Sequence, residues 1–321
     1  MRVLFMGTPD FAVDTLQTLI QSEHEVIGVV TQPDKPKGRS GKMQFSPVKE
    51  VALKYSIPVY QPQRARDEEF LCEVRRICPD VIVVVAFGQI LPKELLEMPK
   101  YGCLNVHASL LPKLRGAAPI QWSVILGDKE SGVTIMQMDE GIDTGDMLLV
   151  EKYQLEEKET GGSLFDKLAK FGGRMMLQVL EAAEEGTLQP VKQNDSEHTY
   201  AKMLSKETGR IDFSKSAVEI ERLVRGLNPW PSAYCFLGDK MLKIWEADVA
   251  EAAEDECPDL ECGAVVMVGK SDFTVKTGEG FLKILSVQLE GKKRMDTAAF
   301  LRGYSLEQGA VLRSERRGNR G

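Results

Sequence analysis

The chain has 321 residues, of which 43% are hydrophobic and 28% are charged. This composition is typical of a globular protein and excludes a largely disordered or low-complexity chain. At about 100 to 200 residues per domain, the length predicts two domains. The longest apolar run, Val81 to Phe87, is far too short for a membrane span, and the apolar block at the start is too short for a signal peptide. We therefore expect a cytoplasmic protein without a membrane partner.

The cysteines are sparse, and none forms a Cys-x-x-Cys pair near a histidine, so no metal site is indicated. We interpret all six as reduced thiols, as expected in the cytosol. An alternative remains for one pair, because Cys257 and Cys262 could form a loop disulfide or half of a metal site.

The net charge of −7 excludes a histone-like protein that binds nucleic acid over its whole surface. Local basic patches are still compatible with it. From position 207 onward the chain has 17 basic and 19 acidic residues, but eight of the acidic ones lie between Glu246 and Glu261. That stretch resembles a solvated loop, and the rest of this half has a basic excess.

Up to about Met138, short β-branched runs alternate with amphipathic stretches. This pattern is typical of a Rossmann-like α/β domain, in which crossover helices connect a parallel sheet. The uninterrupted valine-rich run after position 80 indicates a central strand that is covered on both faces. Strands are predicted at Val3 to Met6, Val26 to Thr31, Val81 to Ala86, Leu104 to His107 and Val133 to Met138.

A long helix is predicted over Gly161 to Glu185, because its apolar residues recur every three or four positions. The polar stretch after it predicts a linker over 190–206. The expected domains are therefore 1–189 and 207–315, followed by a basic tail at 316–321.

The second domain is predicted to start with a helix over Val218 to Leu227, which ends before Pro229 because proline cannot continue a helix. Short strands separated by Gly, Asp and Lys turns follow, and this pattern predicts a small OB-like β-barrel. The five strands are Tyr234 to Leu237, Met241 to Ala247, Gly263 to Val268, Phe273 to Thr277 and Phe281 to Val287.

The turn after the first strand, Gly7 to Phe11, lacks the second and third glycines of a dinucleotide fingerprint. A nicotinamide dehydrogenase is therefore not indicated, although the strand and turn fit the same fold. Gly7 is interpreted as part of a tight turn.

Asn105 and His107 lie two residues apart in a predicted strand, so their side chains share one face near its carboxyl end. In open α/β sheets the ligand crevice lies beyond that end. An amide that donates to an oxyanion, beside an imidazole that moves a proton, is suited to acyl transfer. The alternative is structural: a buried, hydrogen-bonded histidine and a turn-forming asparagine.

An acidic loop, Asp139 to Asp146, follows the next predicted strand. Asp143 lies between two glycines of this loop and could orient His107 or stabilise its protonated form. A Ca²⁺ site and a plain turn are the alternatives. The loop lacks the EF-hand spacing and its distal glutamate, which argues against calcium.

Four positive charges, at Lys35, Lys37, Arg39 and Lys42, lie in a Gly/Pro loop after the second predicted strand. Such a loop is either a solvated surface segment or a phosphate-binding one. Lys292 to Arg294 and the tail Arg313 to Arg320 are further basic clusters in the second domain. Three basic patches on an acidic protein favour a polyanionic partner that contacts both domains.

Several segments distributed over nearly the whole chain carry a family resemblance: Asn105 to His107, Ser109 to Pro112, Arg115 to Ile120 and Asp143 to Gly145, together with Gly7 to Phe11, Thr31 to Asp34, the basic loop and Asn228 to Pro231. Through these segments the chain resembles the folate-dependent formyltransferases. The resemblance implies transfer of the formyl group of 10-formyltetrahydrofolate to the α-amino group of methionine on initiator methionyl-tRNA, without a metal. We expect a monomer.

This resemblance assigns stabilisation of the oxyanion to Asn105 and transfer of the amine proton to His107. It assigns to Asp143 either an orienting role or action through a water molecule. It places the basic loop (Lys35, Lys37, Arg39, Lys42) against the acceptor stem of the tRNA. The folate pocket that it implies consists of Phe87, Gly88, Gln89, Ile90, Leu91, Ser109, Leu110, Leu111, Pro112 and Asp139.

Two other functions remain open. A formyltransferase or formyl hydrolase for a small-molecule amine would use the same Asn105, His107 and Asp143 but would not need the barrel or the basic loop. A nucleic-acid-binding module without catalysis would give His107 a structural role only, and it would show no turnover.

Overall fold

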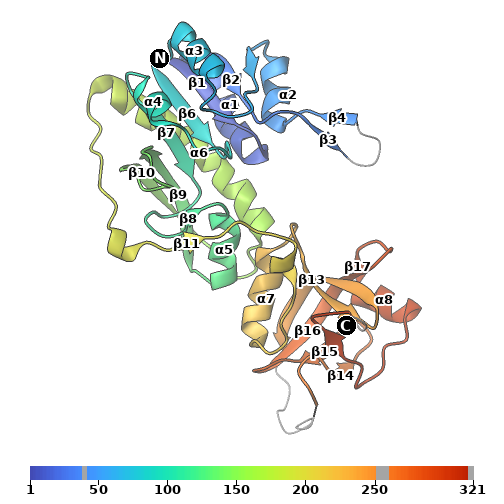
Figure 1. Cartoon of the computed structure of the whole chain (residues 1–321). Helices are drawn as coiled ribbons and strands as arrows, with labels where there is room; N and C mark the ends of the chain where they lie inside the picture. Colours follow the sequence, from blue (N-terminus) through green and yellow to red (C-terminus); the bar gives the residue numbers. More distant parts are fainter. Residues whose placement is uncertain (38–41, 251–259, 317–321) are drawn as a thin grey trace. The chain divides into compact units, whose positions relative to one another are not determined.

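The computed structural model describes residues 1–37, 42–250 and 260–316, which fold into two compact units (Figure 1). Arg39, Cys257, Arg317, Arg320 and most of the acidic run lie outside the described residues. Within the described part, no helix combines the length and apolarity needed to cross a membrane. The first unit consists of Met1–Pro119, Glu130–Gln154 and Phe165–Ala201, and the second of Ile120–Lys129, Leu155–Leu164 and the chain from Lys202 onward.

The first unit is built on a seven-stranded sheet of order β10-β9-β7-β6-β1-β2-β5. The predicted strands are confirmed as β1, β2, β6, β7 and β9, and the valine-rich β6 is central, between β1 and β7. The five neighbouring strands β5, β2, β1, β6 and β7 all run parallel to one another. Strand β9 runs antiparallel to β7 and forms a hairpin with β10. The strands are β1 (Arg2–Gly7), β2 (Glu25–Val30), β5 (Val59–Tyr60), β6 (Val81–Val85), β7 (Cys103–His107), β9 (Glu130–Gln137) and β10 (Met147–Gln154).

Helices cover this sheet (Figure 1). The long helix α6 spans Gly161–Glu185, the same residues that the sequence predicts. Helix α2 starts at Pro47 because the Ser46 side chain accepts a hydrogen bond from Lys49 N at 3.2 Å, and proline is well suited to the first helical turn. The other helical elements of this unit are a 3₁₀ turn (Asp10–Ala12), α1 (Val13–Ile20), α3 (Glu68–Ile77) and α4 (Lys93–Glu97), and α2 ends at Lys54. Helix α5 (Pro119–Leu126) belongs, from Ile120 on, to the second unit.

The two faces of β7 have different neighbours, because side chains alternate along a strand. Val106 faces α6, where Gly172 leaves room for it: a Cβ at Gly172 would lie 2.9 Å from Val106 Cγ1. Cys103 lies on the opposite face, in the hydrophobic cluster that contains residues of α3 and α4 such as Val74 and Leu95. Asn105 and His107 share this second face with Cys103.

Two short strand pairs lie outside the main sheets. The two ends of the basic loop form the short strands β3 (Lys35–Lys37) and β4 (Lys42–Gln44), which pair antiparallel. The segment predicted as a loop from its Gly and Pro residues therefore begins and ends in a two-stranded sheet. The other pair joins β8 (Arg115–Gly116) to β11 (Tyr200–Ala201) in parallel. It brings the chain after α6 beside the segment that follows β7.

The second unit contains α7 (Ala217–Gly226), whose start is stabilised by a capping box between Ser216 and Glu219. A seven-stranded antiparallel sheet, ordered β14-β15-β16-β13-β12-β18 with β17 beside β16, includes all five predicted strands. The sheet is strongly curled, and backbone hydrogen bonds connect its outer strands: Val265 N donates to Ala310 O and Leu312 N to Gly263 O, each at 2.8 Å. The small β-barrel domain is thereby confirmed.

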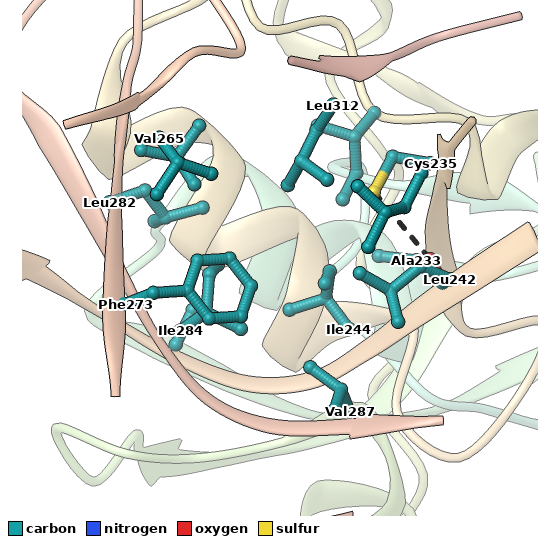
Figure 2. Close-up of a cluster of buried hydrophobic side chains, with 14 of the residues drawn as sticks. Ala233, Cys235, Leu242, Ile244, Val265, Phe273, Leu282, Ile284, Val287 and Leu312 are labelled. Carbon is teal, nitrogen blue, oxygen red and sulfur yellow. Dashed lines mark hydrogen bonds between the residues drawn. The ribbon is translucent and has the colours of Figure 1, made fainter. Parts of the chain in front are cut away.

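The inside of this barrel is an apolar core (Figure 2). Phe273 and Ile284 from neighbouring strands are fully buried, and Val224 of α7 packs against the same cluster. The other elements of this unit are a 3₁₀ turn (Glu207–Gly209), β12 (Ala233–Leu237), β13 (Lys240–Ala250), β14 (Val265–Val268), β15 (Phe273–Lys276), β16 (Phe281–Leu289), β17 (Met295–Asp296), α8 (Thr297–Gly303) and β18 (Leu312–Arg313). A further 3₁₀ turn, Asp195–Glu197, belongs to the first unit.

Candidate active site

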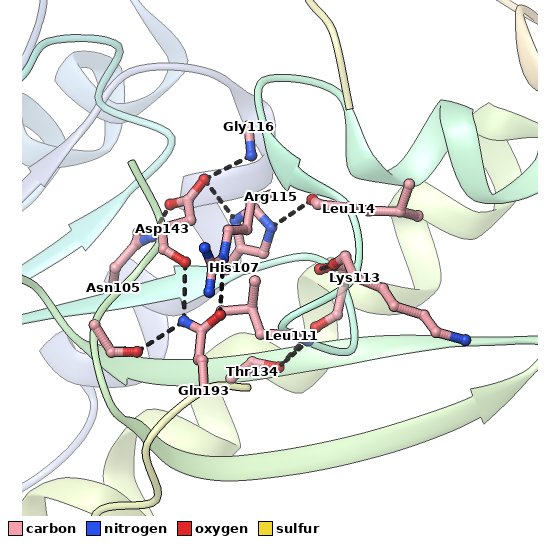
Figure 3. Close-up of polar contacts among 12 residues, drawn as sticks. Asn105, His107, Leu111, Lys113, Leu114, Arg115, Gly116, Thr134, Asp143 and Gln193 are labelled. Atoms are coloured by element: carbon pink, nitrogen blue, oxygen red, sulfur yellow. Dashed lines mark hydrogen bonds and ion pairs between the residues drawn. The ribbon is translucent and has the colours of Figure 1, made fainter. Parts of the chain in front are cut away.

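Asn105, His107 and Asp143 lie together in the first unit (Figure 3). Asn105 and His107 are 8% and 6% exposed at the carboxyl-terminal end of β7. The Asn105 Nδ2 atom is 3.5 Å from Asp143 Oδ1, and His107 Nδ1 is 3.6 Å from Asp143 Oδ2. The loop between β9 and β10 therefore carries its aspartate back to the strand that holds the other two residues.

The imidazole of His107 is buried between polar partners rather than apolar ones. Its Nε2 atom lies 3.0 Å from the carbonyl oxygen of Leu114. A carbonyl oxygen only accepts hydrogen bonds, so Nε2 carries a proton and donates it. In the neutral ring Nδ1 is then the unprotonated nitrogen, and it lies on the side of Asp143. The contacts therefore specify both the orientation and the tautomer of the ring.

The carboxylate of Asp143 is held by the backbone. Its Oδ2 atom accepts a hydrogen bond from Gly116 N at 2.8 Å. The Asp143 backbone is in the left-handed region, with a φ of 54°, a conformation that aspartate tolerates better than most residues. Asp139 shapes the same loop, because its Oδ1 atom accepts from Gly141 N at 3.0 Å and from Thr144 Oγ1 at 2.6 Å.

Two partners of this site are not predicted by any pattern in the sequence, namely the Gly116 amide and the side chain of Gln193. Gln193 Nε2 donates to the backbone oxygens of Asp143 and Gly145, at 2.9 and 2.7 Å. Gln193 lies 50 residues after Asp143 in a polar stretch, and no periodicity or motif distinguishes it from its neighbours there. Its role depends on tertiary contacts alone.

The segment Phe87 to Leu91, expected to contact folate, follows β6 and has both buried and exposed positions. Phe87 and Leu91 are 2% and 4% exposed and belong to the hydrophobic cluster next to α3 and α4. Gly88 and Ile90 are exposed, Ile90 by 78%. Gln89 Oε1 accepts from Ala65 N at 2.7 Å, so this side chain connects the segment to the loop after β5.

The second segment expected to contact folate, Ser109 to Pro112, follows β7. Ser109 is buried, and its hydroxyl donates to Lys113 O at 2.6 Å, which closes a tight turn. Leu111 is also buried, whereas Leu110 and Pro112 are partly accessible. Ser109 and Leu111 thus shape the backbone beside His107, and the accessible positions alternate with them.

The base of the basic loop contains a polar network around Lys49. Lys49 Nζ lies 2.5 Å from Asp34 Oδ2 and 2.8 Å from Gln61 Oε1, and it lies over the Phe45 ring at 4.2 Å. The hydrogen bond from Lys49 and a second one from Gln61 hold the pKa of the Asp34 carboxyl below its usual value. Lys35 itself is exposed at the start of the hairpin.

The basic clusters of the second unit differ from one another. Lys292, Lys293 and Arg294 are all exposed, and the Arg294 guanidinium lies 5.0 Å from the centre of the Trp245 ring. In contrast, Arg313 and Arg316 form ion pairs with Glu261 and Glu290, at 3.0 and 2.9 Å. The described part of the tail is therefore largely neutralised by neighbouring carboxylates.

Among the described residues, no group of three or more histidine, cysteine, aspartate or glutamate side chains is arranged to hold a metal ion. The free thiols there include Cys103 and Cys235, both buried. Burial raises the pKa of the Cys103 thiol to about 12, so this group stays protonated at neutral pH.

Solved structures with this fold include a sugar 3N-formyl transferase, WlaRD, in the presence of dTDP and 5-N-formyl-THF, with a TM-score of 0.65 and 20% identity over 91% of this chain and 99% of that one. HypX from Aquifex aeolicus in complex with tetrahydrofolic acid has a TM-score of 0.61 and 19% identity over 94% of this chain and 47% of that one. At these identities the likeness establishes the fold.

Sequence comparisons are more specific. The formyl transferase family model matches residues 1–180, and the model of the formyl transferase C-terminal domain matches residues 203–305. The methionyl-tRNA formyltransferase of Lachnospira eligens is 60% identical over 97% of this chain and 99% of its own length, and that of Clostridioides difficile is 51% identical over 97% and 100%. With both domains matched and such relatives along nearly its full length, this chain belongs to the formyl transferase family, in the group of the methionyl-tRNA formyltransferases.

Proposed function

We propose that this enzyme transfers the formyl group of 10-formyltetrahydrofolate to the α-amino group of methionine esterified to initiator tRNA. The observation that carries the proposal is that Asn105 and His107 each lie within 3.6 Å of the Asp143 carboxylate. The names of the full-length relatives support the choice of a charged tRNA as the acceptor.

His107 takes the proton that the attacking amine loses. An amine is nucleophilic only when it is unprotonated, and a base is needed as the new C–N bond forms. Nδ1 is the nitrogen available for that proton, because Nε2 already carries a proton that it donates to Leu114 O. The resulting imidazolium is stabilised by the carboxylate of Asp143 next to Nδ1.

Asn105 stabilises the charge that develops on the formyl oxygen. The amine nitrogen adds to the formyl carbon, the C=O electron pair moves to oxygen, and the tetrahedral species carries a negative charge. The Asn105 amide is a donor next to the acid–base pair, and such a donor contributes about 3 kcal/mol to the transition state. The species collapses when the bond to N10 of the folate breaks and N10 takes the proton from His107.

The folate is held by the three segments after β6, β7 and β9, namely Phe87 to Leu91, Ser109 to Pro112 and Asp139. Gly88 has a φ of 82° and no side chain, so its backbone is open to a planar ring. The exposed Ile90 adds apolar surface, while Phe87 and Leu91 support the segment from the core. Folates bound to structures of the same fold support this assignment.

The tRNA is bound through its phosphates by Lys35, Lys37, Arg39 and Lys42 and by the second unit. The exposed cluster Lys292 to Arg294 next to Trp245 supports this role of the barrel, because cations and an aromatic ring together suit a nucleic acid. The acidic net charge of the whole chain means that binding is local.

The test is incubation of the enzyme with 10-formyltetrahydrofolate labelled in its formyl group, together with charged initiator tRNA, the same tRNA uncharged, free methionine or an amino sugar nucleotide. We expect label on the charged tRNA alone. Label on a free amine instead would establish the small-molecule alternative, and tRNA binding without any transfer would leave only a binding module.

A further inference from the structure

Gln193 differs from its surroundings in the segment from 191 to 200, which the structure describes in full. Every other residue of this segment is exposed, whereas Gln193 is partly buried. Its side chain points into the site and ends beside the loop that carries Asp143 (Figure 3). A polar side chain that is turned inward from an exposed segment is there for its hydrogen bonds.

The Gln193 amide makes contacts on both sides, and only one orientation satisfies them. Nε2 donates to the oxygens of Asp143 and Gly145, at 2.9 and 2.7 Å, and both acceptors require an N–H. Oε1 accepts from Arg115 Nε at 2.9 Å, a partner that can only donate. The reversed amide would face two carbonyls with an oxygen and a guanidinium with an NH₂ group.

Arg115 holds Gln193 in this position. The Arg115 side chain is 6% exposed. In addition to the hydrogen bond from its Nε atom, its Nη2 atom forms an ion pair with Asp195 Oδ1 at 2.8 Å. The backbone is fastened as well, because Arg115 N donates to Thr199 O and Ala117 N to Ala201 O, each at 2.9 Å. The segment after α6 is therefore joined to the residues next to His107 by side chains and backbone together.

The Asp143 backbone needs such an anchor. Its left-handed φ of 54° is less favourable than a right-handed one for a residue with a side chain, so contacts from outside the loop help to hold it. Gln193 binds the Asp143 carbonyl, while Gly116 N binds its carboxylate at 2.8 Å. The residue is thus fixed at both ends, with Oδ2 directed to His107 Nδ1.

We infer that Gln193, held by Arg115, is a positioning residue for formyl transfer: it fixes Asp143 so that the carboxylate faces the proton-accepting nitrogen of His107. This inference rests on the proposed function in that it takes Asp143 to act on His107. The contacts of the Gln193 side chain are to Arg115, Asp143 and Gly145. It acts through Asp143, and its loss should therefore change kcat rather than the KM of either substrate.

Gln193→Glu is the informative substitution. It keeps the shape and the contact to Arg115 but replaces the two N–H donors by an oxygen that faces two carbonyls. Displacement of Asp143 by about 1 Å should lower kcat by about 10²-fold. The KM of each substrate should stay unchanged, whereas a merely structural role would not confine the loss to kcat.

The control is Gln189→Glu, the same substitution at an exposed position four residues earlier. It should leave kcat unchanged. Gln193→Met removes the donors without adding charge, so it reports the same effect if the glutamate variant proves unstable. Thermal unfolding of each variant establishes that the folded protein is being assayed.

A double-mutant cycle with Asp143→Asn decides whether Gln193 acts through Asp143. We expect Gln193→Glu to have little further effect on kcat once Asp143 is substituted, whereas additive losses would overturn the inference. Unchanged kcat in both Gln193 variants would overturn it as well.

Hydrogen exchange separates this inference from the proposed function. Exchange of the peptide that covers Gly141 to Met147 should accelerate about tenfold in Gln193→Glu but not in Gln189→Glu, and this measurement needs no substrate. An inactive wild-type chain would overturn the proposed function. An active wild type with unaltered exchange in Gln193→Glu would overturn the positioning role alone.

Discussion

Asp143 Oδ2 accepts a hydrogen bond from the backbone N–H of Gly116 at 2.8 Å, while the same oxygen lies 3.6 Å from His107 Nδ1. The backbone donor keeps the carboxylate in place whether the imidazole is neutral or charged. A carboxylate that is held in this way stabilises a proton on Nδ1 without having to move.

His107→Ala and Asn105→Ala are each expected to lower kcat by a factor on the order of 10² or more, because one removes the proposed base and the other the proposed oxyanion donor. The Kd for charged tRNA should stay within about twofold, since both side chains are buried and are not phosphate contacts. Single-turnover kinetics and a filter-binding titration measure the two quantities. Equal losses in both would contradict the assignment.

Gly145→Ala is expected to disrupt the loop of Asp143. A Cβ at this position would lie 1.7 Å from the backbone oxygen of Gln137, where no rearrangement of a side chain could make room. We expect a loss of at least about 2 kcal/mol in the free energy of unfolding, together with most of the activity. Gly303→Ala is the control, because a Cβ there would have nothing within 4 Å. Similar stability of the two variants would mean that the loop is not constrained as described.

Replacement of Lys35, Lys37, Arg39 and Lys42 by Gln should weaken tRNA binding and reduce its dependence on salt. The slope of log K against log salt concentration should fall by about 0.7 to 0.9 for each phosphate contact that is lost. The kcat at saturating tRNA should change little. The single variant Lys35→Gln has a matched control in Lys170→Gln, which removes one positive charge at an exposed position of α6. An unchanged slope in the fourfold variant would remove this loop from the tRNA contact.

Asp34→Asn is expected to destabilise the protein at neutral pH by about 1 to 3 kcal/mol, because Lys49 would lose its carboxylate partner. The pKa of Asp34 is lowered in the folded state by its hydrogen bonds from Lys49 and Gln61. The ionised carboxylate therefore contributes fully above its unfolded pKa of about 3.9, and its contribution is lost as the pH falls through the lower, folded value.

The measurement is the difference in unfolding free energy between wild type and Asp34→Asn from pH 7 to pH 3. We expect this difference to be constant down to about pH 4 and to shrink below it. Glu181→Gln, at an exposed position near the end of α6, controls for loss of a negative charge. A difference that grows in acid would contradict the ion pair.

Local patterns determined much of this protein from the sequence alone. The period of two along a strand places Asn105 and His107 on one face, and the recurrence of apolar residues every three or four positions predicts α6 over the residues observed. The valine-rich run predicts the central strand β6 for the same kind of reason. These features depend on neighbours in the chain, which the sequence lists directly.

Tertiary structure alone decided how the candidate site is completed. The Gly116 amide and the Gln193 side chain meet Asp143 across separations of 27 and 50 residues, and this meeting depends on the pairing of β8 with β11. The sequence likewise does not predict that β9 runs antiparallel to its neighbour β7. Such contacts are selected by the packing of the whole unit, since a glutamine in a polar stretch carries no local sign of the two carbonyl oxygens that it will bind.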